Sequence, residues 1–84
     1  MENHSVQISR SAERYLKKVP IHLRRRLTEA IVSLKHEPRP VGCIKLSGFD
    51  DIFRLRVGQH RILYSVSDME IVVLKIGHRR DVYR

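Results

Sequence analysis

The chain has 84 residues, which is room for one domain with a small core and too little for a deep, buried cofactor cleft. It carries 17 Lys and Arg against 9 Asp and Glu, a formal net charge of +8. This excess favours a polyanionic partner, nucleic acid before membrane, with an acidic protein partner as the alternative. The single cysteine excludes an internal disulfide and a multi-thiolate zinc site, and neither a signal-peptide core nor an apolar run of about 18 residues is present. We therefore expect a cytoplasmic protein without membrane contact.

The start of the chain has the periods of a strand and a helix. Val6 and Ile8 alternate with polar neighbours, which predicts a short first strand. Ser9 is suited to cap a helix that runs to about Lys18. The apolar stripe of this helix, at helical spacing, consists of Ala12, Tyr15, Leu16 and Val19.

A second helix is predicted to follow directly. Pro20 suits its first turn, where a missing N–H leaves no hydrogen bond unmade, and the helix is expected to reach about His36. Pro38 and Pro40 prevent it from continuing. Its apolar face consists of Leu23, Leu27, Ala30, Ile31 and Leu34.

After the prolines the hydrophobic period changes to that of strands. Three candidates, "IFRLRV", "RILYSV" and "EIVVLKI", are joined by connections short enough for hairpins. The third is apolar on both parities over residues 71–74, which is typical of a strand covered on both faces. The order predicts one α+β domain over residues 1–84. It has a short N-terminal strand, a two-helix hairpin, and a three- to four-stranded antiparallel meander with the helices on one face.

Arginines recur on the first hairpin, "FRLRVGQHRILYSV". Because strand side chains alternate, the apolar residues of its first strand face the helices while Arg54 and Arg56 project from the uncovered face. Arg61 shares that face if the connecting loop has two or four residues or a compensating bulge. Neighbouring guanidiniums repel one another until an anion binds, and their forks match phosphate oxygens. The alternative is three solvated surface arginines.

The C-terminal stretch "KIGHRRDVYR" adds further basic residues and a tyrosine. A terminal strand beside the hairpin would bring Arg79 and Tyr83 to the same concavity. A cationic cleft with an aromatic ring at its edge is typical of sites for single-stranded nucleic acid. Packing of Tyr83 against the sheet is the alternative.

The pattern "KLSG…FRLRVGQHRILYSV…VVLKIGHRRDVYR" resembles the RelE/ParE superfamily of toxins from type II toxin–antitoxin pairs. The resemblance spans about Val6 to Arg84 and is strongest from Lys45 onward. In its RelE branch it implies an mRNA interferase, an endoribonuclease without metal or cofactor. Such an enzyme enters the ribosomal A site and cleaves mRNA through attack of a ribose 2′-OH on the adjacent phosphate. Implied partners are the ribosome, mRNA and a cognate antitoxin that forms a hetero-oligomer with the toxin.

The resemblance also implies which residues carry catalysis. Arg56 and Arg61 are expected to clamp the phosphate, and Arg54 belongs to the same basic set. Arg79 is expected near the leaving 5′ oxygen, and Tyr83 is expected to stack on or orient a base.

The general base is the open point of this assignment. Well-known members of the family carry lysines where this chain has Arg54 and Arg56, and arginine stays protonated in proteins. His60 and His78 titrate in a useful range and are candidates for the acid or base, with ordinary surface positions as the alternative. The remaining option is catalysis carried mainly by charge.

A second basic feature, "HLRRRLTEA", lies in the predicted second helix. Arg24, Arg25 and Arg26 are expected on its solvent side as candidate contacts for ribosomal RNA, or simply as a solvated helix face. The remaining histidines lack the spacing of metal ligands, so no metal site is expected.

Two other functional classes stay open. In the ParE branch of the superfamily, the same fold poisons DNA gyrase and leaves RNA intact. A non-catalytic member would use the arginine face only to bind an antitoxin or RNA.

Overall fold

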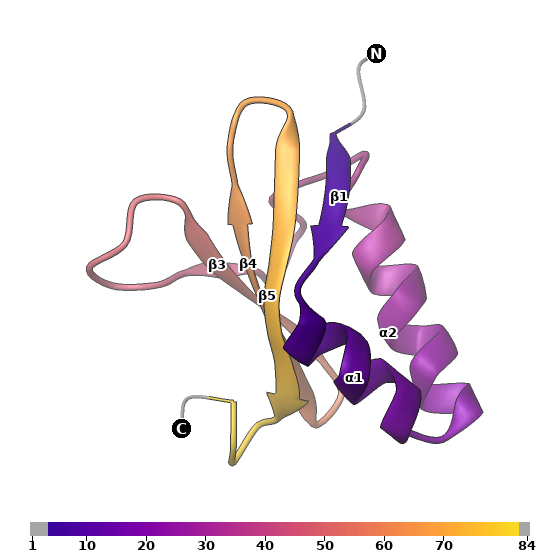
Figure 1. Cartoon of the computed structure of the whole chain (residues 1–84). Coiled ribbons are helices and arrows are strands. Elements are labelled where there is room, and N and C mark those ends of the chain that lie inside the picture. The colour runs from indigo at the N-terminus through magenta and orange to yellow at the C-terminus, as the bar shows by residue number, and fades with distance from the viewer. Residues whose placement is uncertain (1–3, 83–84) are drawn as a thin grey trace.

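The computed structural model describes residues 4–82, which form two helices packed on one face of a five-stranded sheet (Figure 1). The elements follow the predicted order, so the α+β layer architecture is confirmed. The helices are α1 (Arg10–Lys18) and α2 (Ile21–Ser33). The strands are β1 (Ser5–Ile8), β2 (Ile44–Lys45), β3 (Ile52–Val57), β4 (His60–Val66) and β5 (Glu70–His78). Neither helix in residues 4–82 is long and apolar enough to cross a membrane.

The ends of α1 agree with the predicted ones, whereas those of α2 differ. Ser9 caps α1, and its Oγ accepts a hydrogen bond from the backbone N–H of Ala12 at 3.2 Å. Pro20 is the N-cap of α2 rather than a residue of its first turn. The helix ends at Ser33, three residues earlier than expected, and residues 34–36 form turns with bonds to the third residue back. This tighter last turn brings the chain to Glu37, where Pro38 disfavours helical geometry.

The sheet has the order β1-β5-β4-β3-β2 and is larger than the predicted meander. β1 is the edge strand next to β5 and runs parallel to it, while the other pairs of strands are antiparallel. The fourth antiparallel strand is the short β2 before the hairpin, and the terminal strand considered for residues after His78 is absent from the described part of the chain. These pairings join segments up to 65 residues apart, which local periodicity does not reveal.

β5 lies between β1 and β4 in the sheet, and its two faces are covered unequally. Ile71, Val73 and Ile76 are buried, whereas Leu74 is exposed, so the prediction of a strand covered on both faces is wrong at this residue. A register shift opposite Leu63 and Tyr64 makes Leu74 the extra residue of a bulge. Its carbonyl accepts a hydrogen bond from Ser9 Oγ at 2.8 Å, which joins the start of α1 to the bulge.

The core lies between the helices and the sheet. The predicted apolar stripes of both helices pack there, with Leu16 and Leu27 among the buried residues. Tyr64 is completely buried, stacks on Phe53 and donates a hydrogen bond from its hydroxyl to the carbonyl of Pro38 at 2.8 Å. This bond ties the loop after α2 to the sheet and satisfies a hydroxyl that would otherwise be costly to bury.

Candidate functional site

The face of the sheet that the helices leave open carries the arginines of the β3–β4 hairpin. Phe53 and Leu55 are buried against the helices, so the alternate residues Arg54 and Arg56 lie on the opposite face. Arg61 stands directly opposite Arg56 in the antiparallel ladder. Directly paired residues have Cβ atoms about 4.5–5.5 Å apart, so the two side chains leave the sheet as neighbours. The arginine face is defined below by Arg54, Arg56 and Arg61.

A tight turn between β3 and β4 places Arg61 on the same face of the sheet as Arg54 and Arg56. Val57 pairs with His60, so the loop consists of Gly58 and Gln59 alone. Gly58 has a φ of 60°, as the first central residue of a type II′ hairpin turn requires, and glycine adopts that angle without strain. The condition set by the sequence, a loop of two or four residues, is therefore met.

Arg61 is the most buried residue of the arginine face, with 9% of its surface exposed. Its Nη1 donates hydrogen bonds to the carbonyl of Gly58 at 3.2 Å and to that of His60 at 3.0 Å. Arg54 is half-buried and Arg56 is exposed. The face therefore presents one accessible guanidinium beside one that the hairpin turn holds in place.

The segment after β5 folds back beside Arg61. The backbone N–H of Arg79 bonds to the carbonyl of Gln59 at 2.8 Å, which continues the ladder by one step. Strand positions two residues apart share a face of the sheet. Arg79 is therefore on the same face as Gly77, which pairs with Arg61. Val82 is buried over Gly77, where a Cβ on the glycine would lie 3.4 Å from the Cα of Val82. Tyr83, the predicted base-stacking residue, lies outside the described residues.

The two candidate histidines lie on the other face of the sheet. His60 and His78 are paired across β4 and β5, with ring centroids 5.7 Å apart, and the His60 ring is 6.0 Å from that of Tyr15 on α1. Burial, followed by the nearby His78, Arg26 and Arg61, lowers the pKa of His60. The backbone N–H of Arg80 donates to Nδ1 of His78 at 3.3 Å. The sheet thus separates both imidazoles from the arginine face.

The comparisons with known proteins agree with this geometry. The model of the ParE toxin of type II toxin–antitoxin system, parDE, matches residues 6–83. The putative toxin RelE1 of Methanocaldococcus jannaschii is 31% identical over 85 residues, which cover 95% of this chain and 94% of that protein. The chain belongs to the RelE/ParE superfamily of toxins. It is a RelE-like member, a toxin of the type II toxin–antitoxin class.

Solved structures place this RelE-like toxin among archaeal and bacterial relatives. The archaeal RelE–RelB complex from Pyrococcus horikoshii matches with a TM-score of 0.83 and 32% identity, over 95% of this chain and 99% of that chain. The RelBE2 toxin–antitoxin complex from Mycobacterium tuberculosis matches with a TM-score of 0.78 and 29% identity, over 92% of this chain and 99% of that chain. These likenesses cover nearly all of this chain.

The three successive arginines of the toxin's α2 do not form one surface. Arg24 turns back to the end of α1, where its Nε donates to the carbonyl of Leu16 at 2.7 Å and its Nη2 to that of Lys17 at 3.0 Å. The guanidinium of Arg26 lies at the hairpin turn, with Nη2 3.4 Å from the Cβ position of Gly58. Arg25 is exposed. The expectation of a solvent-side position is therefore wrong for Arg24 alone, which turns back onto α1, while Arg25 and Arg26 are exposed as expected.

We expect Arg24→Gln to lower the free energy of unfolding by about 1–3 kcal/mol, because the charged side chain caps carbonyls that α1 leaves unpaired. Arg25→Gln is the matched control, with the same charge change on an exposed neighbour and an expected effect within about 0.5 kcal/mol. Urea unfolding followed by circular dichroism measures both. Equal effects of the two substitutions would rule out the capping role.

Sequence reasoning missed the covering of Gly77 by Val82 and the inward turn of Arg24. Gly77 was visible as a point where the chain is able to bend, but a close approach of backbone to backbone depends on a segment that no local period describes. The part of the chain that the structure describes contains no group of three or more His, Cys, Asp or Glu placed to hold a metal ion.

Proposed function

We propose that this toxin is a ribosome-dependent endoribonuclease that cleaves mRNA in the A site without a metal ion. The observation that carries the proposal is the arginine face itself, with Arg56 and Arg61 directly opposite each other and Arg54 two residues along the same strand. Guanidinium groups match phosphate oxygens and keep their charge at any physiological pH. A pair of them beside a phosphate favours the extra negative charge that develops when a nucleophile adds to phosphorus.

The proposed reaction is an internal transfer within the RNA. The 2′ oxygen attacks the adjacent phosphorus and loses its proton, and the bond from phosphorus to the 5′ oxygen of the next nucleotide breaks. The products are a 2′,3′-cyclic phosphate and a 5′-hydroxyl that takes up a proton. Exposed Arg56 contacts the phosphate, while Arg61 contributes fixed positive charge from the neighbouring strand. Arg79 acts near the leaving oxygen, and Tyr83 stacks on or orients a base.

In this proposal charge carries most of the catalysis. Arginine is a poor general base, and His60 and His78 face α1 across the sheet from the arginine face. The two protons are therefore exchanged with water. Positioned proton transfer is typically worth about 10²–10⁴-fold, so a toxin of this kind is slower than one that supplies a base. Arg25 and Arg26 are the α2 arginines whose exposure suits a contact with ribosomal RNA.

A cognate antitoxin is the proposed protein partner, and cytoplasm is the proposed location. Support comes from the matching relatives, which include solved RelE–RelB complexes of Pyrococcus horikoshii and Methanococcus jannaschii. The net charge of +8 favours an antitoxin segment with acidic residues, ordered as it wraps around the toxin.

The match to the ParE toxin model supports a second candidate function. In that case the toxin inhibits DNA gyrase through protein contacts, and RNA stays intact. The third candidate function is a non-catalytic role, in which the arginine face only binds antitoxin or RNA.

Mapping of mRNA 5′ ends after induction in cells separates these functions. We expect in-frame cuts at A-site codons with wild-type toxin and their loss with Arg79→Ala. Growth arrest with DNA damage that depends on gyrase, and without such cuts, would reject the endoribonuclease and support the ParE-like function. Growth arrest with neither signal would support the non-catalytic role.

A further inference from the structure

The loop between β2 and β3 presents an exposed aromatic ring. Phe49 has 54% of its surface exposed, a large fraction for a phenylalanine in so small a protein. The loop is nevertheless ordered by hydrogen bonds from the backbone N–H of Leu46 to the carbonyl of Ile52 at 2.9 Å and from Phe49 N–H to the carbonyl of Leu46 at 3.3 Å. The ring is thus held outward on a defined turn.

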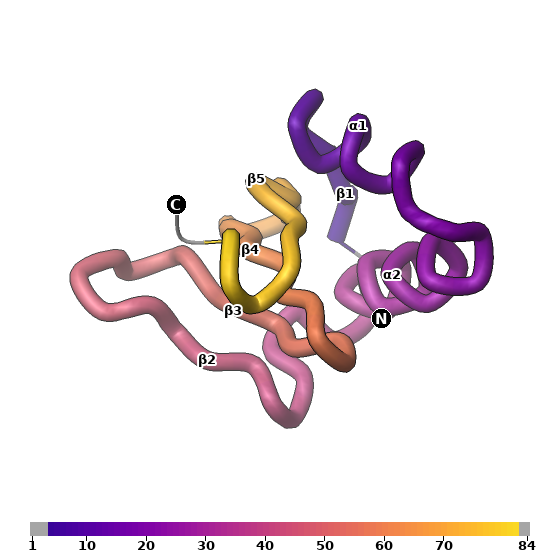
Figure 2. The backbone as a smooth tube through the Cα atoms, turned by 90° about the horizontal axis from the view of Figure 1, so that it is seen from below, coloured from indigo at the N-terminus to yellow at the C-terminus, as the bar shows by residue number. Residues whose placement is uncertain are grey.

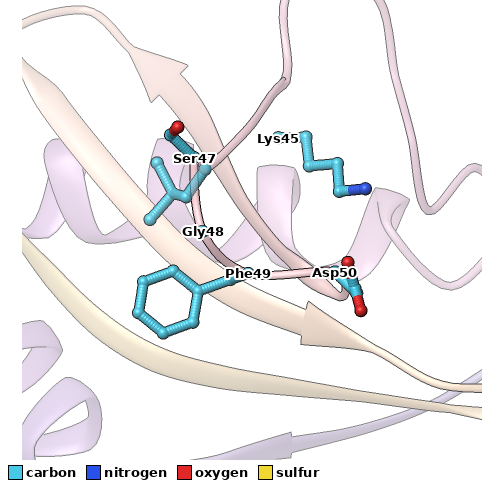
Figure 3. A pocket seen from close by; sticks show the side chains of 6 residues that line it. Lys45, Ser47, Gly48, Phe49 and Asp50 are labelled. Carbon is cyan, nitrogen blue, oxygen red and sulfur yellow. The ribbon is translucent and has the colours of Figure 1, made fainter.

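The Phe49 ring extends from the β2–β3 loop in the opposite direction to the side chains of Lys45 and Asp50 (Figure 3). Lys45 pairs with Phe53, so it lies on the helix side, and Figure 3 shows the Phe49 ring pointing away from Lys45 and Asp50. These residues, with Leu46, Ser47 and Gly48, line a shallow hollow of about 480 Å³. The carboxylate of Asp50 is therefore turned away from the ring (Figure 3).

The β2–β3 loop and the segment after β5 flank the open face. Both project from the sheet on the side opposite the helices (Figures 1 and 2). The arginine face lies on β3 and β4 between them, and β3 leads directly from the loop to Arg54 and Arg56. A nucleic-acid strand that crosses the arginines therefore has the segment of Arg79 on one side and Phe49 on the other.

We propose that Phe49 is a stacking platform for a nucleobase of the mRNA, at a nucleotide separate from the one that Tyr83 contacts. The proposal rests on the proposed endoribonuclease function. Proteins that hold single strands combine a positive groove for the backbone with exposed rings for the bases, and any base has a π-face to stack. The arginines of β3, the strand that follows this loop, favour a nucleotide over an uncharged apolar peptide, because the phosphates meet the arginines while the base covers the ring.

Single-turnover cleavage of mRNA in programmed ribosomes, titrated with toxin, tests this platform. Phe49→Ala is expected to raise the toxin concentration for half-maximal rate by about 5- to 150-fold, the usual value of one stacked base. Phe49→Tyr, which keeps the ring, is expected to restore the wild-type value. Ile44→Ala removes an exposed apolar side chain from the adjacent strand β2 and is expected to have a much smaller effect.

An mRNA with one abasic nucleotide, moved along the A-site region, identifies the base. At one position, the abasic substitution is expected to raise the half-maximal concentration of wild-type toxin by the same factor as Phe49→Ala does. The Phe49→Ala variant is expected to show no further change with this mRNA. The four measurements form a double-mutant cycle between the ring and the base. Equal losses with Ile44→Ala and Phe49→Ala would overturn stacking in favour of an apolar protein contact. Wild-type behaviour of Phe49→Ala would overturn the platform alone, whereas absence of cleavage by wild-type toxin would overturn the endoribonuclease as well.

Discussion

Arg61→Ala is expected to lower the rate of mRNA cleavage by about 10²–10³-fold, the usual loss when one fixed electrostatic group of a transition state is removed. The reason is its position opposite Arg56, which in the proposed reaction contacts the phosphate. Because Arg61 is nearly buried and bonded to the carbonyls of Gly58 and His60, its charge needs no reorganisation during the reaction. Single-turnover cleavage in programmed ribosomes at saturating toxin measures the effect.

Two further variants make this result specific. Arg14→Ala removes an exposed positive charge from α1 and is expected to cleave at the wild-type rate, which separates a local role from the loss of net charge. Arg61→Lys keeps the charge without the planar fork and is expected to fall between wild type and Arg61→Ala. The melting temperature of each variant shows whether the hairpin turn is intact. Full activity of a folded Arg61→Ala toxin would remove this residue from the site.

Gly77→Val is expected to lower cleavage by about 10²-fold, as misplacement of a catalytic group by about 1 Å does. Val82 covers Gly77 so closely that a Cβ lies 3.4 Å from its Cα, and the γ-carbons of valine have no room beneath it. The segment of Arg79 is then displaced from its bond to Gln59. The measurement is the same cleavage assay, with hydrogen exchange at the Arg79 amide to follow the segment.

Gly77→Ala is the matched control for that substitution. Its single Cβ makes only van der Waals contact with Val82, so near wild-type cleavage is expected. The substituted strand position is identical in both variants, and only the bulk beneath the C-terminal segment differs. If Gly77→Val cleaves as fast as Gly77→Ala while amide exchange at Arg79 rises, the segment does not position a catalytic group.

Local periodicity predicted the strands and helices well, because the spacing of apolar residues along an element shows which of its faces is buried. The alternation of Phe53 and Leu55 with Arg54 and Arg56 is a property of any strand, so the arginines had to share a face. Ser9 was also recognisable as a helix cap, because capping involves only neighbouring residues.

The position of Arg61 shows where local reasoning ends. The sequence limited the possibilities to loops of certain lengths, and the structure selected the two-residue turn with Gly58 at a positive φ. The histidines show the same limit. Only the pairing of His60 with His78 beside Tyr15 reveals that both lie across the sheet from the arginines.

The sequence alone thus determined a basic α+β toxin with a strand that presents arginines on one face. The tertiary structure decided what surrounds them: the parallel addition of β1 to β5, the return of Val82 over Gly77, and the turn of Arg24 towards α1. The physical reason is that a period of two or 3.6 residues records which side of an element is buried. Which distant segment buries it depends on contacts between parts of the chain that share no local pattern.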